Sequence, residues 1–183
     1  MRLSEADILI VPGLGAIGPD HWQRRWGTRF STGHFVVPES GDRRTLEPWV
    51  ETIRHDIMMA TRPVVLVAHS LGVSAVVHAA TELHDAKVRG AFLVAPVDHE
   101  GEVLPDHAAL FGNVPRDPLP FPSMLIASTD DPYCSTERAA DLATCWASDL
   151  HLAGDAGHID TASGHGPWPE GLVMFTRLMQ RLR

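Results

Sequence analysis

Six short apolar runs alternate with amphipathic helical patterns along this chain, and this alternation limits the possible folds more than any other feature. The apolar runs cover residues 6–13, 34–38, 64–69, 88–96, 121–129 and 149–153. The helical patterns lie at residues 20–30, 46–60, 71–83, 135–146 and 172–182. Such continuous apolar runs are typical of strands covered on both faces, and strands that alternate with helices pair in parallel. The sequence therefore predicts an α/β fold: a doubly wound, mostly parallel six-stranded sheet with helices on both faces.

One segment interrupts the alternation. Residues 97–120 are rich in Pro, Gly, Asp and His, and we expect them to form a surface excursion with a turn or two of helix at most. The sequence contains no internal repeat and no linker that would separate a second domain. At 183 residues the chain can bury a sizeable core, so we expect a single domain over residues 1–183.

The charge balance restricts the possible partners. The formal net charge is −8 with histidine neutral, whereas sequence-independent binding to nucleic acid or to an anionic membrane depends on basic patches. No apolar run approaches the roughly 20 residues needed to span a bilayer. The first residues lack the basic and apolar regions of a secretory signal. We therefore expect a cytoplasmic protein that binds neither nucleic acid nor membranes, and the sequence gives no readable signal for a protein partner.

Thiols and metal-binding patterns are sparse. Cys134 and Cys145 would lie about 16 Å apart on one helix, which is too far for a disulfide. Two free thiols suit a reducing compartment. The spacings typical of zinc and calcium sites do not occur, so we expect no metal and no other cofactor.

A candidate nucleophile lies between a predicted strand and a predicted helix, in Ala68-His69-Ser70-Leu71-Gly72. The segment matches the G-x-S-x-G turn of hydrolases, with alanine in place of the first glycine. On such a turn the serine hydroxyl is exposed at the edge of the sheet, and small residues two positions away let strand and helix approach closely. The alternative is that the serine caps the helix, a role that serine often takes.

A serine hydroxyl needs a base, and the base needs an orienting acid, before it reacts at neutral pH. Asp130 and Asp131 follow the fifth predicted strand, and His158 follows the sixth in a Gly-flanked loop. Because the carboxyl ends of parallel strands meet at one edge of a sheet, we expect an acid and a base beside Ser70 there. The chain order Ser, Asp, His is that of α/β-hydrolases. Alternatively, Asp131 forms an Asp-Pro turn and His158 is a surface imidazole.

Two backbone N–H groups would bind the oxyanion of the tetrahedral intermediate. We expect one at Leu71, directly after the nucleophile, and the other at Leu14, in the glycine-rich loop after the first strand. Three glycines of this loop also match the G-x-G-x-x-G pattern of dinucleotide sites. A nucleotide is disfavoured because the predicted helix begins after the last of these glycines.

The substrate pocket is less well defined by the sequence. We expect its lining to include Gly13, Trp22, His69 and Trp168. For the two tryptophans, packing of loops onto the sheet is an equal alternative. His165 is the rival base. Three further histidines could lie at the pocket mouth, although we expect them to be solvent exposed: His21, His99 and His107.

Four segments in order carry a resemblance to a known family: "ILIVPGLG…HW", "AHSLG", "STDDPY" and "AGHIDTASGHGPWPEG". Over essentially the whole chain they resemble the small, nearly lidless serine α/β-hydrolases of the retinoblastoma-binding-protein-nine family and its bacterial relatives. The resemblance implies a triad of Ser70, Asp131 and His158, with Asp131 chosen because the acid directly precedes the proline. Two residues depart from the pattern: Ala68 replaces the elbow glycine, and Asp160 stands where relatives often carry asparagine.

The expected activity is hydrolysis of a small-molecule ester, or of a thioester or amide, through an acyl-enzyme on Ser70. An acyltransferase would use the same three residues. The alternative from another class is a non-catalytic protein-binding module on a hydrolase scaffold.

Overall fold

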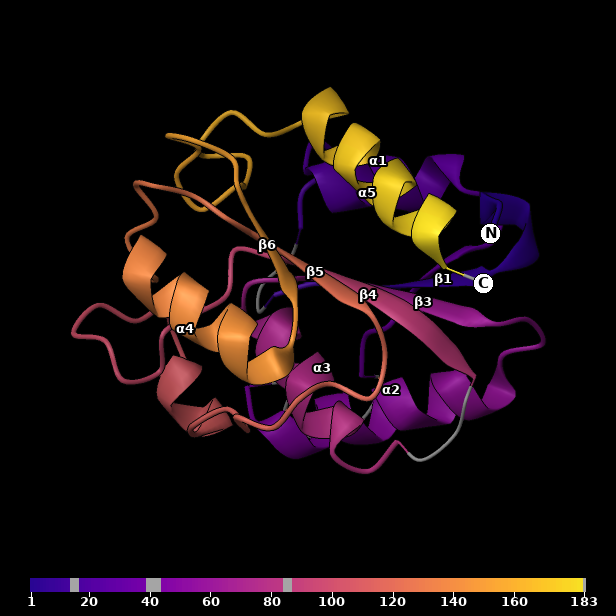
Figure 1. The fold of residues 1–183 in the computed structure, drawn as a ribbon, viewed down its shortest axis with the longest axis horizontal. Helices are drawn as coiled ribbons and strands as arrows, with labels where there is room; N and C mark the ends of the chain where they lie inside the picture. Colours follow the sequence, from indigo (N-terminus) through magenta and orange to yellow (C-terminus); the bar gives the residue numbers. More distant parts are fainter. Residues whose placement is uncertain (14–16, 39–43, 84–86, 183) are drawn as a thin grey trace.

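The computed structural model describes residues 1–13, 17–38, 44–83 and 87–182 (Figure 1). Six strands form one sheet in the order β2-β1-β3-β4-β5-β6, and every neighbouring pair is parallel. The strands are β1 Asp7–Val11, β2 Gly33–Phe35, β3 Val64–His69, β4 Val88–Val94, β5 Ser123–Ala127 and β6 Asp149–Leu152. The predicted doubly wound parallel sheet is confirmed.

Five α-helices cover the two faces of this sheet. They are α1 Trp22–Arg29, α2 Leu46–Met59, α3 Leu71–Ala80, α4 Thr136–Trp146 and α5 Pro169–Arg181. Figure 1 shows α1 and α5 on one face and α2, α3 and α4 on the other. Each face has its own core of buried apolar side chains. Every residue of β3 is buried, as expected for a central strand with helices on both sides.

The described residues also form two short 3₁₀ helices, Leu3–Glu5 and Ala108–Phe111. The second is the single turn within the excursion of residues 97–120. Its Ala108 and Phe111 are buried in the core that contains side chains of α2, α3 and α4. The excursion therefore lies against the α/β body through this turn.

Some predicted helices and strands extend further than the observed ones. Helix α3 ends at Ala80, not Leu83, because the next N–H groups bond three residues back, as in a 3₁₀ turn. Strand β2 ends at Phe35, short of the predicted Pro38. Cys134 precedes α4 and Cys145 lies within it, so the two free thiols do not share a helix as predicted.

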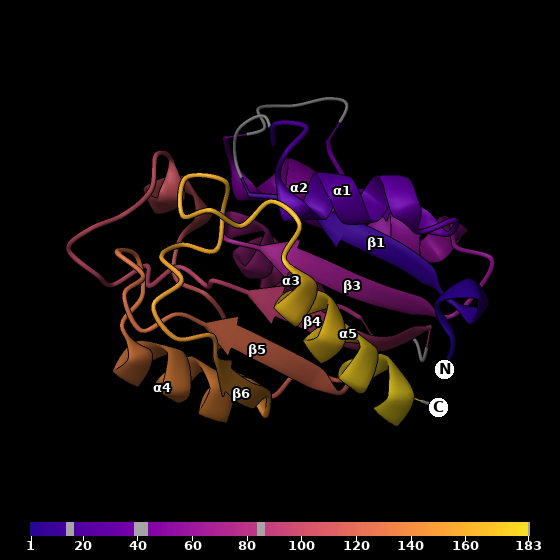
Figure 2. The same ribbon diagram turned by 90° about the horizontal axis from the view of Figure 1, so that it is seen from above.

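The strand order places a topological switch between β1 and β3, since the chain adds β2 on one side of β1 and β3 on the other. Figure 2 shows the strands pointing the same way, so the loops that follow them gather at one edge. In open α/β sheets, ligands bind outside the carboxyl ends of the strands at such a switch. Within the described residues, no helix is long and apolar enough to cross a membrane.

Candidate active site

Ser70 occupies a strained turn between β3 and α3. Its backbone has φ 56° and ψ −129°, a region that costs a residue with a side chain about 1–3 kcal/mol. Ser70 stands at the N-cap position of α3, but its side chain makes no capping hydrogen bond. The geometry matches the nucleophile turn of hydrolases and does not support the capping alternative.

Small residues on both sides of Ser70 allow this turn. A Cβ on Gly72 would lie 2.6 Å from the carbonyl oxygen of Pro12 and closer still to that of Val11, so α3 begins directly against the end of β1. Ala68 is fully buried and pairs with Val11 and Leu93 in neighbouring strands. Alanine at position 68 is therefore compatible with the turn.

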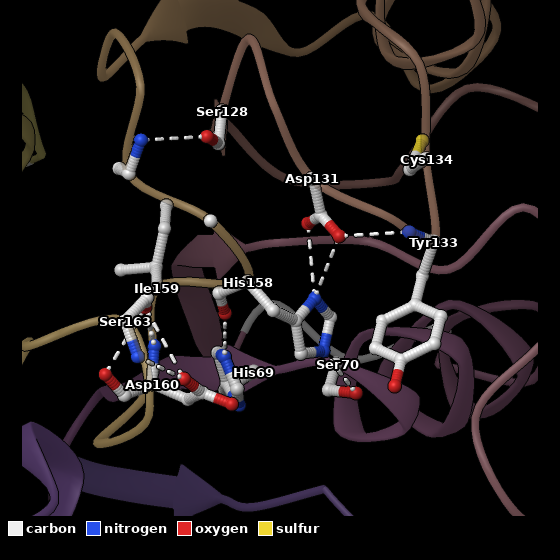
Figure 3. Close-up of polar contacts among 12 residues, drawn as sticks. His69, Ser70, Ser128, Asp131, Tyr133, Cys134, His158, Ile159, Asp160 and Ser163 are labelled. Carbon is white, nitrogen blue, oxygen red and sulfur yellow. Dashed lines mark hydrogen bonds and ion pairs between the residues drawn. The ribbon is translucent and has the colours of Figure 1, made fainter.

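The structure brings together the three residues singled out from the sequence (Figure 3). The Ser70 hydroxyl lies 2.8 Å from Nε2 of His158, and Nδ1 of His158 lies 3.0 and 2.9 Å from the two carboxylate oxygens of Asp131. A carboxylate only accepts hydrogen bonds, so Nδ1 carries the proton and Nε2 is free to accept one from Ser70. The Asp131 side chain is only 1% exposed, and that of His158 is 10% exposed.

Asp130 and Ser128 fasten the loop that carries His158. Oδ1 of Asp130 accepts hydrogen bonds from the Ser128 hydroxyl and from the Gly157 N–H, both at 2.6 Å. The buried Ser128 hydroxyl also accepts the Ala156 N–H at 2.9 Å. The two adjacent carboxylates thus have separate roles: Asp131 contacts the imidazole and Asp130 holds its loop.

Of the two backbone N–H groups predicted to bind the oxyanion, the structure describes one, at Leu71. Leu71 is the first residue of α3, where backbone N–H groups have no acceptor within the helix. A Cβ on Gly13 would lie 3.0 Å from that of Ser70, so the loop after β1 runs directly past the serine. Leu14, the other predicted donor, lies outside the described residues.

A cavity of about 430 Å³ opens beside Ser70. It is lined by the loops that follow β1, β3, β5 and β6, with Pro105 contributed by the excursion. Of the residues expected in the substrate pocket, Gly13 and His69 line this cavity, whereas Trp22 and Trp168 do not. Both tryptophans are less than 5% exposed and pack against each other with ring centroids 5.0 Å apart. Both side chains pack in the core on the α1 and α5 side of the sheet.

Two buried histidines border the site. His69 donates from Nε2 to the carbonyl oxygen of His158 at 2.8 Å and so helps to position that residue. His21 caps α1 by accepting the Gln23 N–H. It is 5% exposed, so the expectation of solvent exposure was wrong. Burial lowers the pKa of His69 well below its usual value and lowers that of His21 to about 4. Both rings are therefore neutral at pH 7.

The low pKa of His21 predicts a loss of stability in mild acid. An exposed imidazole in the unfolded chain titrates near pH 6.5, so the unfolded state binds this proton first as the pH falls from about 6.5 to about 4. We expect the free energy of unfolding to decrease by about 2 kcal/mol more in the wild type than in His21→Asn between pH 7 and pH 5. Asparagine keeps a capping acceptor but does not titrate.

Urea denaturation at the two pH values measures this difference. The other buried histidines are present in both proteins, so the comparison isolates the effect of replacing residue 21. Equal losses in the two proteins would show that His21 does not titrate with a lowered pKa.

Three site residues were not identified from the sequence as such. Tyr133, the only tyrosine, lines the cavity and contacts the His158 ring edge-on, with centroids 4.7 Å apart. Its position directly after Asp131-Pro132 was an available signal. Asp160 also lines the cavity, and Ser128 anchors the histidine loop. The predicted rival base, His165, bonds Ser163 at 3.1 Å and contacts Trp168 edge-on.

Known proteins resemble this chain along most of its length. The sequence profile of the serine hydrolase family matches residues 8–177. A protein described as a YdeN-like hydrolase from Pectobacterium atrosepticum is 31% identical, aligns with 96% of this chain and 91% of its own, and has a TM-score of 0.83. No protein with a curated description matches the chain significantly.

Two more distant structures share the fold. The ydeN gene product of B. subtilis is 21% identical over 96% of this chain and 100% of its own, with a TM-score of 0.65. Est1E from Butyrivibrio proteoclasticus is 13% identical over 96% and 88% of the respective chains, with a TM-score of 0.68.

Proposed function

The chain belongs to the serine hydrolase family, and on that premise we propose that it cleaves a small ester through an acyl-enzyme formed on Ser70. The observation that carries the proposal is the continuous hydrogen-bonded series from Ser70 through His158 to Asp131, beside an open cavity. A thioester or a small amide would be attacked in the same way.

In the first half of the reaction, Oγ of Ser70 bonds to the acyl carbon while Nε2 of His158 takes the hydroxyl proton. The carbonyl electron pair moves onto oxygen, where the Leu71 N–H stabilises it; a second donor is expected from Leu14. Asp131 holds the imidazole in the required tautomer and stabilises the imidazolium. The tetrahedral intermediate then collapses, the alcohol leaves with the proton from His158, and the acyl group stays on Ser70.

In the second half, water replaces the alcohol. His158 removes a proton from water as its oxygen attacks the acyl carbon, and returns that proton to Oγ of Ser70 when the acid departs. The strained backbone of Ser70 contributes by holding Oγ at the mouth of the cavity before substrate arrives. Holding the nucleophile in this position lowers the reorganisation that attack requires.

A fluorophosphonate probe tests the proposal, since it reacts preferentially with an activated serine. We expect the wild type to be labelled and Ser70→Ala to remain unlabelled. Ser31→Ala, which removes an exposed serine ahead of β2 at the opposite edge of the sheet, should label like the wild type. Absence of labelling in the folded wild type would contradict the enzyme and favour the protein-binding alternative.

A further inference from the structure

The cavity beside Ser70 has one charged wall. Asp160 is the only Asp, Glu, Lys or Arg among the described residues that line it. Asp131 lies behind the His158 ring, and its carboxylate is paired with the imidazole. Asp160 has no role in the mechanism proposed for ester cleavage, so its presence in the lining requires a separate explanation.

The Asp160 carboxylate is held in a fixed orientation. Its Oδ1 accepts hydrogen bonds from the N–H of Ser163 at 2.9 Å and from the Ser163 hydroxyl at 3.2 Å. The Ser163 hydroxyl in turn accepts the Asp160 N–H at 3.0 Å. Figure 3 shows Asp160 and Ser163 hydrogen-bonded to each other next to His69. The other oxygen, Oδ2, has no hydrogen-bond partner among the described residues, which leaves it available to a ligand.

No described cation in the lining neutralises this charge. The nearby histidine is His21, whose pKa is lowered to about 4 by burial even though the negative charge of Asp160 opposes that shift. His69 is neutral for the same reason, namely burial. His158 is neutral whenever it acts as a base. A substrate therefore meets a negative cavity at neutral pH, on a protein whose formal net charge is already −8.

We propose that Asp160 makes the site selective for acyl substrates that carry a positive charge, such as a quaternary ammonium or a protonated amine, and that it disfavours acyl groups that carry a carboxylate. The inference rests on the proposed function, because it assumes that the acyl group occupies the cavity beside Ser70. Thr161 and Ala162 continue the same wall without adding charge. Asp160 acts here as a specificity residue and takes no part in bond making.

Three p-nitrophenyl esters of similar size separate charge from shape: the ester of γ-butyrobetaine, that of its neutral isostere with carbon in place of nitrogen, and that of glutaric acid. The test variant is Asp160→Asn, because an amide oxygen can still accept both hydrogen bonds from Ser163. The matched control is Asp117→Asn, which removes one exposed carboxylate from the excursion, outside the cavity lining.

In the wild type and in Asp117→Asn, we expect kcat/KM to decrease from the cationic to the neutral to the anionic ester, with a spread of about tenfold or more at low salt. Asp160→Asn should reduce the spread, taken as the ratio of kcat/KM between the cationic and the anionic ester within that variant, to about twofold, since the charge contribution is removed. An unchanged spread in Asp160→Asn would overturn the proposal. So would a wild type that hydrolyses the anionic ester as fast as the cationic one.

Binding to Ser70→Ala separates this inference from the proposed function. This variant cannot form an acyl-enzyme, so calorimetry with the three esters measures affinity alone. Tighter binding of the cationic ester, lost in Ser70→Ala/Asp160→Asn, would support a cation-selective cavity even if the wild type hydrolysed none of the esters. Ser70-dependent hydrolysis without charge preference would leave the esterase in place and reject the role of Asp160.

Discussion

Replacing either Ser70 or His158 with alanine is expected to lower kcat for an aryl ester by about 10⁶-fold, and replacing both should lower it hardly further. The reason is that the serine and the imidazole act as one unit, joined by the 2.8 Å hydrogen bond between Oγ and Nε2. Once either is missing, the other has no role in proton transfer. Initial rates of p-nitrophenolate release, with purified single and double variants, measure the three losses.

His165→Ala provides the control for this prediction. His165 is a Gly-flanked histidine of the same loop region, but its contacts are with Ser163 and Trp168, not with Ser70. We expect this variant to keep kcat within about tenfold of the wild type, because it leaves the base in place. If instead His165→Ala abolished hydrolysis while His158→Ala retained more than a small fraction of it, the assignment of the base would be wrong.

Gly72→Ala should have the largest effect on stability of any single methyl addition near the site. The new Cβ would collide with the carbonyl oxygens of Val11 and Pro12, which are backbone atoms and cannot turn aside. Helix α3 would have to move away from β1, at a cost of about 3 kcal/mol or more. We expect a lower urea midpoint and a displaced Ser70, seen as a loss of both fluorophosphonate labelling and esterase activity.

Gly18→Ala is the matched comparison. Gly18 belongs to the cavity loop, but a Cβ there would meet no atom within 4 Å. Its φ is not in the left-handed region, so alanine introduces no backbone strain. We expect the free energy of unfolding to change by at most about 0.5 kcal/mol. Equal destabilisation by the two substitutions would mean that the close approach of α3 to β1 does not limit residue 72.

The sequence is a good guide to the fold because the relevant signals are local and repeated. The four inner strands, β1, β3, β4 and β5, are mostly apolar, and parallel pairing follows from the helices between the strands. Parallel pairing in turn brings the segments after β3, β5 and β6 to one edge, whatever the detailed loop conformations. This is why His158 and a carboxylate of the Asp130-Asp131 pair were expected beside Ser70 although they are far apart in the chain; the choice of Asp131 followed from the family resemblance.

The lining of the cavity could not be predicted in the same way, because it depends on contacts between distant loops. Trp22 illustrates the difficulty: its indole N–H donates to the carbonyl oxygen of Ile159 at 2.9 Å, which fixes the ring in the core. No pattern around residue 22 indicates a partner at residue 159. The burial of His21 follows from the same packing, since its ring lies against Trp22 and His69.

The outermost position of β6 has a consequence for when the protein can act. His158 is carried by the segment that follows this edge strand, 88 positions after Ser70. During synthesis at about 5–20 residues per second, the nucleophile leaves the ribosome well before the segment that supplies its base. A nascent chain therefore lacks the base of the proposed reaction until the segment that follows β6 has been made.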